Sequence, residues 1–266
     1  MRRNIICWIL VIALASISGA SFSGSDAEAL CKNPKFTCMR VQKGQTWQSL
    51  FPDPQIRTMV MKLNRVNIQA RPGSIIVVPN NLLNITHLEL SPFARQIPAP
   101  GEKLLIFDPK IHAWAAYDAM GRLVNWGPGA GGRDWCPDIG SACHTKTGQF
   151  YVYNKGGAGC ISNKFPIPDG GAPMPYCMFF HGGYAFHGSD TVPGFNASHG
   201  CVRLFNEDAE WLSHNFVEAP NKANGYKGTK VIIYPYSVSQ MKEASLDRSY
   251  ENSPIHYSYS TQWPTQ

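Results

Sequence analysis

A cysteine flanked by glycine and valine lies near the end of the segment AFHGSDTVPGFNASHGCVRLF, residues 185–205. This residue, Cys201, follows His199 by two positions and His187 by fourteen. A thiol attacks a carbonyl carbon as the thiolate, and a neighbouring imidazole can take the thiol proton and return it to the leaving group. Gly200 has no Cβ, so its backbone can turn successive N–H groups into one pocket that holds an oxyanion. The pattern therefore indicates acyl transfer by a cysteine–histidine pair, and a turn with a buried thiol is the alternative.

The N-terminus has the pattern of an export signal. Arg2 and Arg3 precede an uncharged apolar run over residues 5–17, and small residues follow, with candidate cleavage sites after Ala20 and Ala29. A membrane anchor is the alternative, but the run is shorter than the roughly 20 apolar residues that span a bilayer. We therefore predict a signal peptide over residues 1–29, no stable membrane span after cleavage, and a location in the periplasm or cell envelope.

Removal of such a signal takes away Cys7 and leaves seven cysteines. Seven is an odd number, so in an oxidising compartment at least one thiol stays unpaired. The spacings suggest the disulfides Cys31–Cys38, Cys136–Cys143 and Cys160–Cys177, which would leave Cys201 free. Sequence does not fix this pairing, because six cysteines allow 15 connectivities. A zinc site made of Cys136, Cys143 and His144 is the alternative, but the usual C-x-x-C pairs are absent, and we expect neither metal nor cofactor.

The elements that must position Cys201 are short strands. Apolar runs separated by turn residues predict strands in KLLIFD, AWAAYDA, GRLVNWGPGAGG, GQFYVYNKGG, YAFHG and KVIIYPY, all between residues 103 and 236. One helix is predicted in NEDAEWLSHNFVEA, with Asn206 as its N-cap and with Ala209, Leu212 and Phe216 on one face. The predicted fold class is mainly β, with one or two helices. Residues 237–266 have little apolar periodicity, so we predict a disordered tail there.

Residues 38–80 predict a separate small unit in the order strand, helix, helix, strand. Lys43, Gly44, Thr46, Asn64 and the segment from Gly73 to Pro79 resemble the pattern of a LysM module, although Gln45 and Trp47 depart from it. The resemblance implies binding to glycans that contain N-acetylglucosamine, and a module reduced to a spacer is the alternative. The stretch of residues 81–101 is rich in proline towards its end and predicts a linker.

The charge of the chain excludes little but favours an acidic partner. The formal net charge is +6 and the pI is about 8.9. No dense run of Lys and Arg and no nucleic-acid motif accompanies this charge. We interpret it as weak attraction towards an anionic surface such as a cell wall, and we expect no nucleic-acid partner.

The string SHGCVR, residues 198–203, follows His187 after a loop of ten residues, 188–197. This arrangement resembles the signature of the L,D-transpeptidase catalytic domain, also called the YkuD domain. The segments TKTGQF (145–150), PMPYCMFF (173–180) and GTKVIIY (228–234) agree with the same family. Two departures are Lys146, where proline is usual, and the shortness of the loop. The resemblance covers residues 102–236 and implies a β-sandwich or barrel domain.

The resemblance also implies roles for individual residues. Cys201 is the expected nucleophile and His187 the general base and acid, oriented by the backbone carbonyl of Gly188. The N–H groups of His199, Gly200 and Cys201 are the expected oxyanion hole. Supporting roles are expected for Gly188, Ser198, His199, Gly200 and Arg203, and substrate contacts for Met174 and Tyr176. His199 as the base, Arg203 as a partner of a substrate carboxylate rather than a brace of the loop, and burial of Met174 and Tyr176 in the core are the alternatives.

The implied reaction begins on a peptidoglycan stem tetrapeptide. Cys201 forms a thioester and D-alanine leaves, and the acyl group then passes to an amine. That amine belongs to a second stem, which gives a 3–3 cross-link, or to an envelope protein. Three other functions stay open: an L,D-carboxypeptidase that uses water as acceptor, a non-catalytic peptidoglycan-binding protein, and an unrelated secreted cysteine protease.

Overall fold

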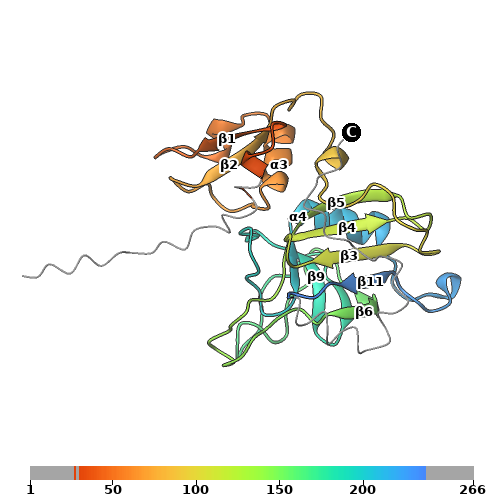
Figure 1. Cartoon of the computed structure of the whole chain (residues 1–266). Coiled ribbons are helices and arrows are strands. Elements are labelled where there is room, and N and C mark those ends of the chain that lie inside the picture. The colour runs from red at the N-terminus through yellow and green to blue at the C-terminus, as the bar shows by residue number, and fades with distance from the viewer. Residues whose placement is uncertain (1–26, 28–29, 238–266) are drawn as a thin grey trace, which may run out of the picture.

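The computed structural model describes residue 27 and residues 30–237 (Figure 1). The predicted signal peptide, apart from Ala27, and the predicted tail, apart from Ser237, lie outside the described residues. Among the residues that are described, none of the helices has both the length and the apolar content needed to cross a membrane.

A nine-stranded sheet forms the body of the molecule. Its strands are β3 (Leu104–Asp108), β4 (Ala113–Tyr117), β5 (Leu123–Ala130), β6 (Gly148–Tyr151), β7 (Asn154–Lys155), β8 (Met178–His181), β9 (Tyr184–Gly188), β10 (Val202–Leu204) and β11 (Lys230–Ile233). They are arranged in the order β6-β11-β3-β4-β5-β10-β9-β8-β7. The pairs β11–β3 and β10–β9 are parallel and the other neighbours antiparallel. The predicted mainly β class is therefore confirmed.

The sheet curls so that its two halves enclose a core, as in a half-barrel. Phe150 of β6 and Phe180 of β8 belong to strands far apart in the sheet order, yet their ring centroids are 5.5 Å apart. Phe107 of β3 likewise meets Phe186 of β9 edge to face, at 6.5 Å. This contact shows that Phe186 points into the core. Because side chains alternate along a strand, the neighbours of Phe186 in β9 point to the opposite face of the sheet.

The N-terminal unit consists of β1 (Phe36–Arg40), α2 (Trp47–Leu50), α3 (Pro54–Leu63) and β2 (Ile75–Pro79). Thr46 caps α2 through a capping box, and the side chain of Asp53 accepts from the N–H groups of Gln55 and Ile56 at the start of α3. The indole of Trp47 is buried, and its Nε1 donates to Ile68 O at 2.8 Å. The expected order of elements is present in this unit, whereas its identity as a LysM module stays a prediction.

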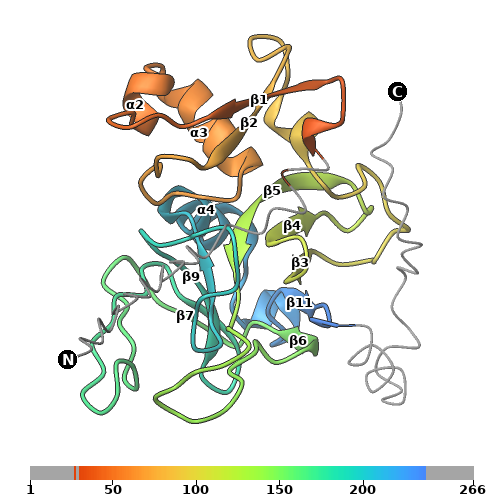
Figure 2. The same cartoon turned by 60° about the vertical axis from the view of Figure 1, so that its left-hand side comes forward.

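The N-terminal unit lies next to β5 and to α4 (Asn206–Trp211), as Figures 1 and 2 both show. The stretch 81–101 was expected to be a linker, but it packs against the outer face of β3, β4 and β5. It contains the 3₁₀ helix η1 (His87–Leu90), and its residues Leu90, Phe93 and Ile97 are buried. Strand β3 is therefore covered on both faces, which explains its unbroken apolar sequence.

The predicted helix is present in two parts. α4 is followed directly by the π-helical turn η2 (Leu212–Phe216), and a short 3₁₀ turn, η3 (Lys222–Asn224), lies further on. Ala209, Leu212 and Phe216 are buried as predicted. The prediction of Asn206 as N-cap is wrong: Phe205 is the cap, and Asn206 Nδ2 donates instead to Asp190 Oδ1 at 2.6 Å.

Three disulfides are present, and they are the predicted pairs Cys31–Cys38, Cys136–Cys143 and Cys160–Cys177. Among the residues that the structure describes, Cys201 is the one cysteine with a free thiol. The alternative of a zinc site at Cys136 and Cys143 is therefore wrong in this oxidised state.

Candidate active site

Cys201 and His187 lie on one face of the sheet. β9 and β10 are parallel neighbours, with His187 opposite Arg203 and Phe186 opposite Val202. Phe186 and Val202 point into the enclosed core, and side chains alternate between the faces of a strand. His187 and Arg203 therefore point to the other face, as does Cys201 one residue before β10. Cys201 packs there against a small cluster formed by Met174, Cys177 and Ala185.

The imidazole of His187 is buried and held by its own strand. Nδ1 lies 2.8 Å from Gly188 O. A carbonyl oxygen only accepts hydrogen bonds, so Nδ1 carries the proton and Nε2 keeps its lone pair. Burial lowers the pKa of His187 to about 4, opposed by the hydrogen bond to Gly188 and assisted by the charge of Arg203. The ring is therefore neutral at pH 7 and able to accept a proton.

The thiol of Cys201 is protonated at rest. Burial raises its pKa, while the backbone at Ala185 and the charge of Arg203 act in the opposite direction. Sγ lies 3.5 Å from Gly183 O, which is an acceptor for the S–H group. The thiol and the imidazole on this sheet face are thus both neutral at rest, so the arrangement is not a preformed thiolate–imidazolium ion pair, and an unprotonated imidazole of this kind can act as a proton acceptor.

Gly200 and Ser198 shape the turn before the thiol. Gly200 has φ +124°, and a Cβ there would lie 2.6 Å from the ring of Tyr184, so only glycine fits without strain. Ser198 is buried; its Oγ donates to Cys201 O at 2.5 Å and accepts from Gly200 N at 3.0 Å. The N–H of Gly200 is thus engaged by a side chain. Of the three expected oxyanion donors, those of His199 and Cys201 remain as candidates.

His199 faces away from the thiol, towards the loop that the Cys136–Cys143 disulfide closes. Its Nε2 lies 3.0 Å from Asp138 Oδ1, and its ring meets Phe165 at 4.7 Å. Ligand atoms of Cys136, Asp138 and His199 all lie within 4.8 Å of one another. Because the sulfur of Cys136 is bonded to Cys143, it offers no thiolate, and what is left is a histidine–aspartate hydrogen bond. This arrangement suits the predicted supporting role of His199.

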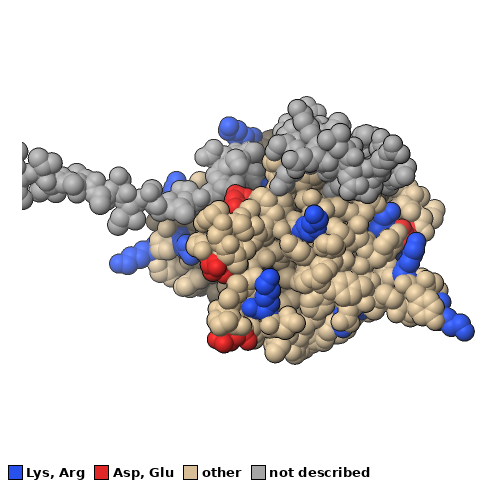
Figure 3. Space-filling view, turned by 90° about the horizontal axis from the view of Figure 1, so that it is seen from below, with Lys and Arg blue, Asp and Glu red and all other residues tan. Residues whose placement is uncertain are grey.

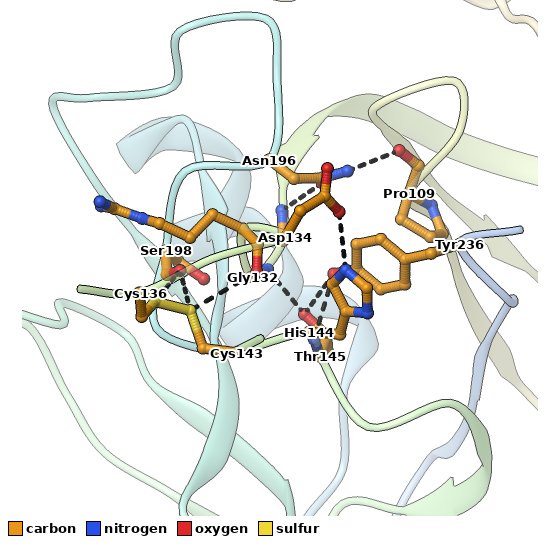
Figure 4. A network of polar contacts seen from close by, with 12 residues as sticks. Pro109, Gly132, Asp134, Cys136, Cys143, His144, Thr145, Asn196, Ser198 and Tyr236 are labelled. Carbon is orange, nitrogen blue, oxygen red and sulfur yellow. Dashed lines mark hydrogen bonds and ion pairs between the residues drawn. A yellow bond between two sulfur atoms is a disulfide. The ribbon is translucent and has the colours of Figure 1, made fainter. Parts of the chain in front are cut away.

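A polar network braces residues 196–198 (Figure 4). Asn196 accepts from Gly131 N at 2.9 Å and donates to Pro109 O at 2.9 Å. Ser198 O accepts from Arg133 N at 3.1 Å and lies 3.3 Å from Cys143 Sγ. Thr145, bonded to Gly132 N and to the hydroxyl of Tyr236, continues this network. The turn that carries Cys201 is therefore held from behind by residues 131–145.

Arg203 braces the loop between His187 and Cys201. Its Nη1 donates to Thr191 Oγ1 at 3.2 Å. Burial lowers the pKa of Arg203, the nearby charge of Arg133 adds to this, and the charge of Cys201 opposes it. Arg203 thus holds the loop and is also a cation close enough to favour a thiolate at Cys201.

The two predicted substrate contacts differ in position. Met174 is buried in the cluster that borders Cys201. Tyr176 packs against the main core instead, and its hydroxyl donates to Glu210 Oε1 at 2.8 Å. The roles of Met174 and Tyr176 in binding stay predictions.

Lys and Arg side chains are scattered over the face of the molecule shown in Figure 3 and are not gathered in one patch.

Three residues that contact the site or its loop were not predicted from the sequence. Tyr184 lies under Gly200, and Asn67 bonds to the loop 188–197. The pKa of Tyr153 is raised by burial and by the charge of Cys201, which places its hydroxyl near the thiol. Tyr153 and Tyr184 lie in predicted strand segments, where the two-residue period could have put them on a face. Nothing in the sequence marks Asn67.

Comparisons with known proteins find one matching family and several similar solved structures. The YkuD family, described as the L,D-transpeptidase catalytic domain, matches residues 103–233. Among solved structures, the L,D-transpeptidase of Xylanimonas cellulosilytica is 25% identical over 66% of this chain and 78% of that chain, with a TM-score of 0.47. The L,D-transpeptidase of Mycobacterium smegmatis is 19% identical over 50% and 59%, with a TM-score of 0.38. That of Stackebrandtia nassauensis is 18% identical over 55% and 61%, with a TM-score of 0.41. The chain thus spans about three fifths of the last two, and no curated protein matches it.

Proposed function

We propose that this enzyme, whose residues 103–233 belong to the YkuD family of L,D-transpeptidase catalytic domains, joins peptidoglycan stem peptides through a thioester on Cys201. One observation carries the proposal. The one free thiol among the described residues lies on the same sheet face as a histidine whose Nδ1 is held by Gly188 O, which leaves Nε2 open as a base.

In the first half of the reaction, Nε2 of His187 takes the proton of Cys201. Sγ then attacks the carbonyl carbon between the third residue of a stem tetrapeptide and its terminal D-alanine. The N–H groups of His199 and Cys201 stabilise the oxyanion. The C–N bond breaks, His187 returns the proton to the departing amine of D-alanine, and a thioester remains on Cys201.

In the second half, an amine attacks the thioester carbon. His187 takes a proton from this amine, an amide bond forms, and the thiol of Cys201 is restored when His187 gives its proton back. The acceptor is the side-chain amine of a second stem, which produces a 3–3 cross-link. A lysine of an envelope protein would react by the same chemistry.

The site of action is the cell envelope, which agrees with the disulfide content. Disulfides persist in oxidising compartments and are rare in the cytosol. Three are present in the described residues, and Cys160–Cys177 closes a loop just before β8 and β9. The predicted signal peptide and the net charge of +6 support export to an anionic wall.

The N-terminal unit supplies a place for the glycan of the same polymer. A pocket in it is lined by residues of the α2 start, of α3 and of the segment after α3, among them Thr46, Trp47, Arg57, Met61 and Asn67. Its hydroxyl, amide and guanidinium groups are of the kinds that bind the hydroxyl groups of a sugar. We take this pocket as the glycan-binding site of a LysM-like module.

The test is mass spectrometry of the purified protein after incubation with a disaccharide-tetrapeptide. We expect a cross-linked dimer, released D-alanine and a trapped mass increase on Cys201, and no product from the Cys201→Ala variant. Tripeptide without dimer would replace the proposal by an L,D-carboxypeptidase. Binding to wall sacculi without any thioester would replace it by a non-catalytic binding protein.

A further inference from the structure

One asparagine of the N-terminal unit is bonded to the loop that joins the candidate base to the candidate nucleophile. Asn67 N donates to Val192 O at 3.0 Å, and Val192 N donates back to Asn67 Oδ1 at 2.7 Å. Asn67 Nδ2 donates to Ser189 O at 2.7 Å. The preceding residue, Val66, forms a β-bridge with Pro193. Backbone and side chain of Asn67 thus satisfy three polar groups of residues 189–192.

Apolar contacts also hold the N-terminal unit against the loop 188–197. Val192 is fully buried in a cluster with Ala130 of β5 and Phe205, and Met61 of α3 packs against this cluster. A buried backbone N–H without a partner is costly, so the acceptor that Asn67 gives to Val192 N stabilises this position of the loop. The sequence separation between Asn67 and Val192 is 125 residues, so the contact exists only through the docking of the N-terminal unit.

The position of the loop matters because each of its ends is bonded to a candidate catalytic residue. It begins at Gly188, whose carbonyl orients His187, and continues into Ser198, which bonds to Cys201. From the catalytic domain it is held by Asn206 at Asp190 and by Arg203 at Thr191. Leu204 O also accepts from Ser189 N at 2.9 Å. Asn67 adds a clamp on residues 189–192 that comes from outside the family domain.

We propose that Asn67 is a positioning residue of the transpeptidase reaction, which fixes the loop 188–197 so that His187 and Cys201 keep their relative geometry. The inference rests on the proposed function, and it extends the site beyond residues 103–233. Asn67 also lines the pocket of the N-terminal unit, so the same side chain borders the candidate glycan site and the catalytic loop.

The experiment compares Asn67→Ala, the conservative Asn67→Asp and the control Asn84→Ala in the full purified protein. Asn84 is an exposed asparagine of the same half of the chain, and its side chain bonds only to Asn81. We measure amide hydrogen exchange of peptides over 188–198, kcat and KM of cross-linking, and the pH profile of Cys201 alkylation by iodoacetamide. Exchange and alkylation need no peptidoglycan substrate, so they report on Asn67 even if the proposed reaction is absent.

Asn67→Ala removes two side-chain hydrogen bonds, so we expect about tenfold faster exchange at residues 189–192 and about tenfold lower kcat, with KM changed much less. Alkylation should move to lower pH, because a loosened loop lets more water reach the partly buried thiol. Asn67→Asp keeps the acceptor for Val192 N and should lie in between, whereas Asn84→Ala should match the unmodified protein.

Two results would overturn the inference. Unchanged exchange over 188–198 in a folded Asn67→Ala protein would mean that the residue does not hold the loop. Faster exchange with unchanged kcat and an unchanged alkylation profile would mean that it only fastens the N-terminal unit. Should Asn67→Ala fail to fold, the same measurements on Asn67→Asp decide the matter.

Discussion

The imidazole of His187 is bonded to the carbonyl oxygen of Gly188, with Nδ1 and O 2.8 Å apart. This contact does what a carboxylate does in many catalytic triads, because it fixes both the tautomer and the direction of the ring. It does so without a negative charge. The imidazolium form therefore gains little stabilisation, and burial keeps the pKa of His187 low, at about 4.

The first prediction concerns the pH dependence of thioester formation. The lowered pKa of His187 means that the base is unprotonated down to about pH 4. We expect a single-turnover rate that is level between about pH 5.5 and 8 and falls near pH 4, where a protonated imidazole can no longer accept the thiol proton. His187→Gln should lower this rate by roughly 10²–10⁴-fold and abolish the acid decline.

The measurement is the rate of mass increase on Cys201 with tetrapeptide. His214→Gln replaces a histidine of η2 and should keep both the rate and its profile. An acid decline centred near the ordinary histidine value of about 6.5 would contradict the burial of the base.

The second prediction concerns the turn before the thiol. Gly200→Ala places a Cβ 2.6 Å from the ring of Tyr184 at a φ of +124°. We expect acylation of Cys201 to fall by at least about a hundredfold, because a shift of the order of 1 Å misplaces the nucleophile. Gly159→Ala is the matched control, since a Cβ there meets nothing within 4 Å. Equal rates for the two variants would show that the turn tolerates movement.

Much of the sheet could be predicted from sequence for a simple reason. β3 and β4 are buried on both faces, so their apolar runs are unbroken and stand out. β10 has three residues, too few for any periodicity, and β8 lies in a segment that resembles a family motif rather than a strand. The packing of residues 81–101 was missed because Leu90, Phe93 and Ile97 have helical spacing in a stretch where Pro92, Pro98 and Pro100 disfavour a helix and indicate a linker.

The residues of the candidate site likewise include some that the sequence predicts and some that it does not. Cys201 and His187 are marked by residue type and spacing, and the odd cysteine count agrees with the three disulfides observed. Asn206 is a typical cap residue at a helix start, but its amide bonds to Asp190 across a tertiary contact. Asn67 acts across 125 residues of sequence. Residue propensities and spacing along the chain do not predict contacts that form only when two units dock.

The third prediction separates two disulfides that have equal sequence separation. Cys136–Cys143 and Cys31–Cys38 each join residues seven apart, so the chain-entropy model gives both a similar stabilisation of about 2.5 kcal/mol. Only the first touches Ser198, through Cys143 Sγ. We expect both double Cys→Ser variants to lose comparable free energy of unfolding in urea. Only Cys136→Ser/Cys143→Ser should also slow the acylation of Cys201, and equal acylation rates would contradict the link.

The fourth prediction concerns a buried ion pair between the two units. Lys62 of α3 bonds to Asp208 of α4, and both side chains are buried. Burial raises the pKa of Asp208 to about 6; Lys62 opposes this rise and Glu207 adds to it. At a pH between the ordinary carboxyl pKa and about 6, the folded state therefore holds a proton on Asp208 that the unfolded chain releases. Stability is therefore greater below the unfolded pKa of Asp208 and decreases as pH rises through its folded pKa.

Lys62→Met should raise the pKa of Asp208 further, because the attraction that favours the carboxylate is gone. The loss of unfolding free energy relative to the unmodified protein should then increase from pH 5.5 to pH 8 and reach about 3–5 kcal/mol at pH 8, where an unpaired buried carboxylate must ionise or hold its proton at a cost. The double variant Lys62→Met/Asp208→Leu removes both charges and should recover most of this loss at either pH. Urea unfolding at the two pH values measures all three proteins. A deficit of Lys62→Met that is the same at pH 5.5 and pH 8 would mean that Asp208 is not buried as a charge between the two units.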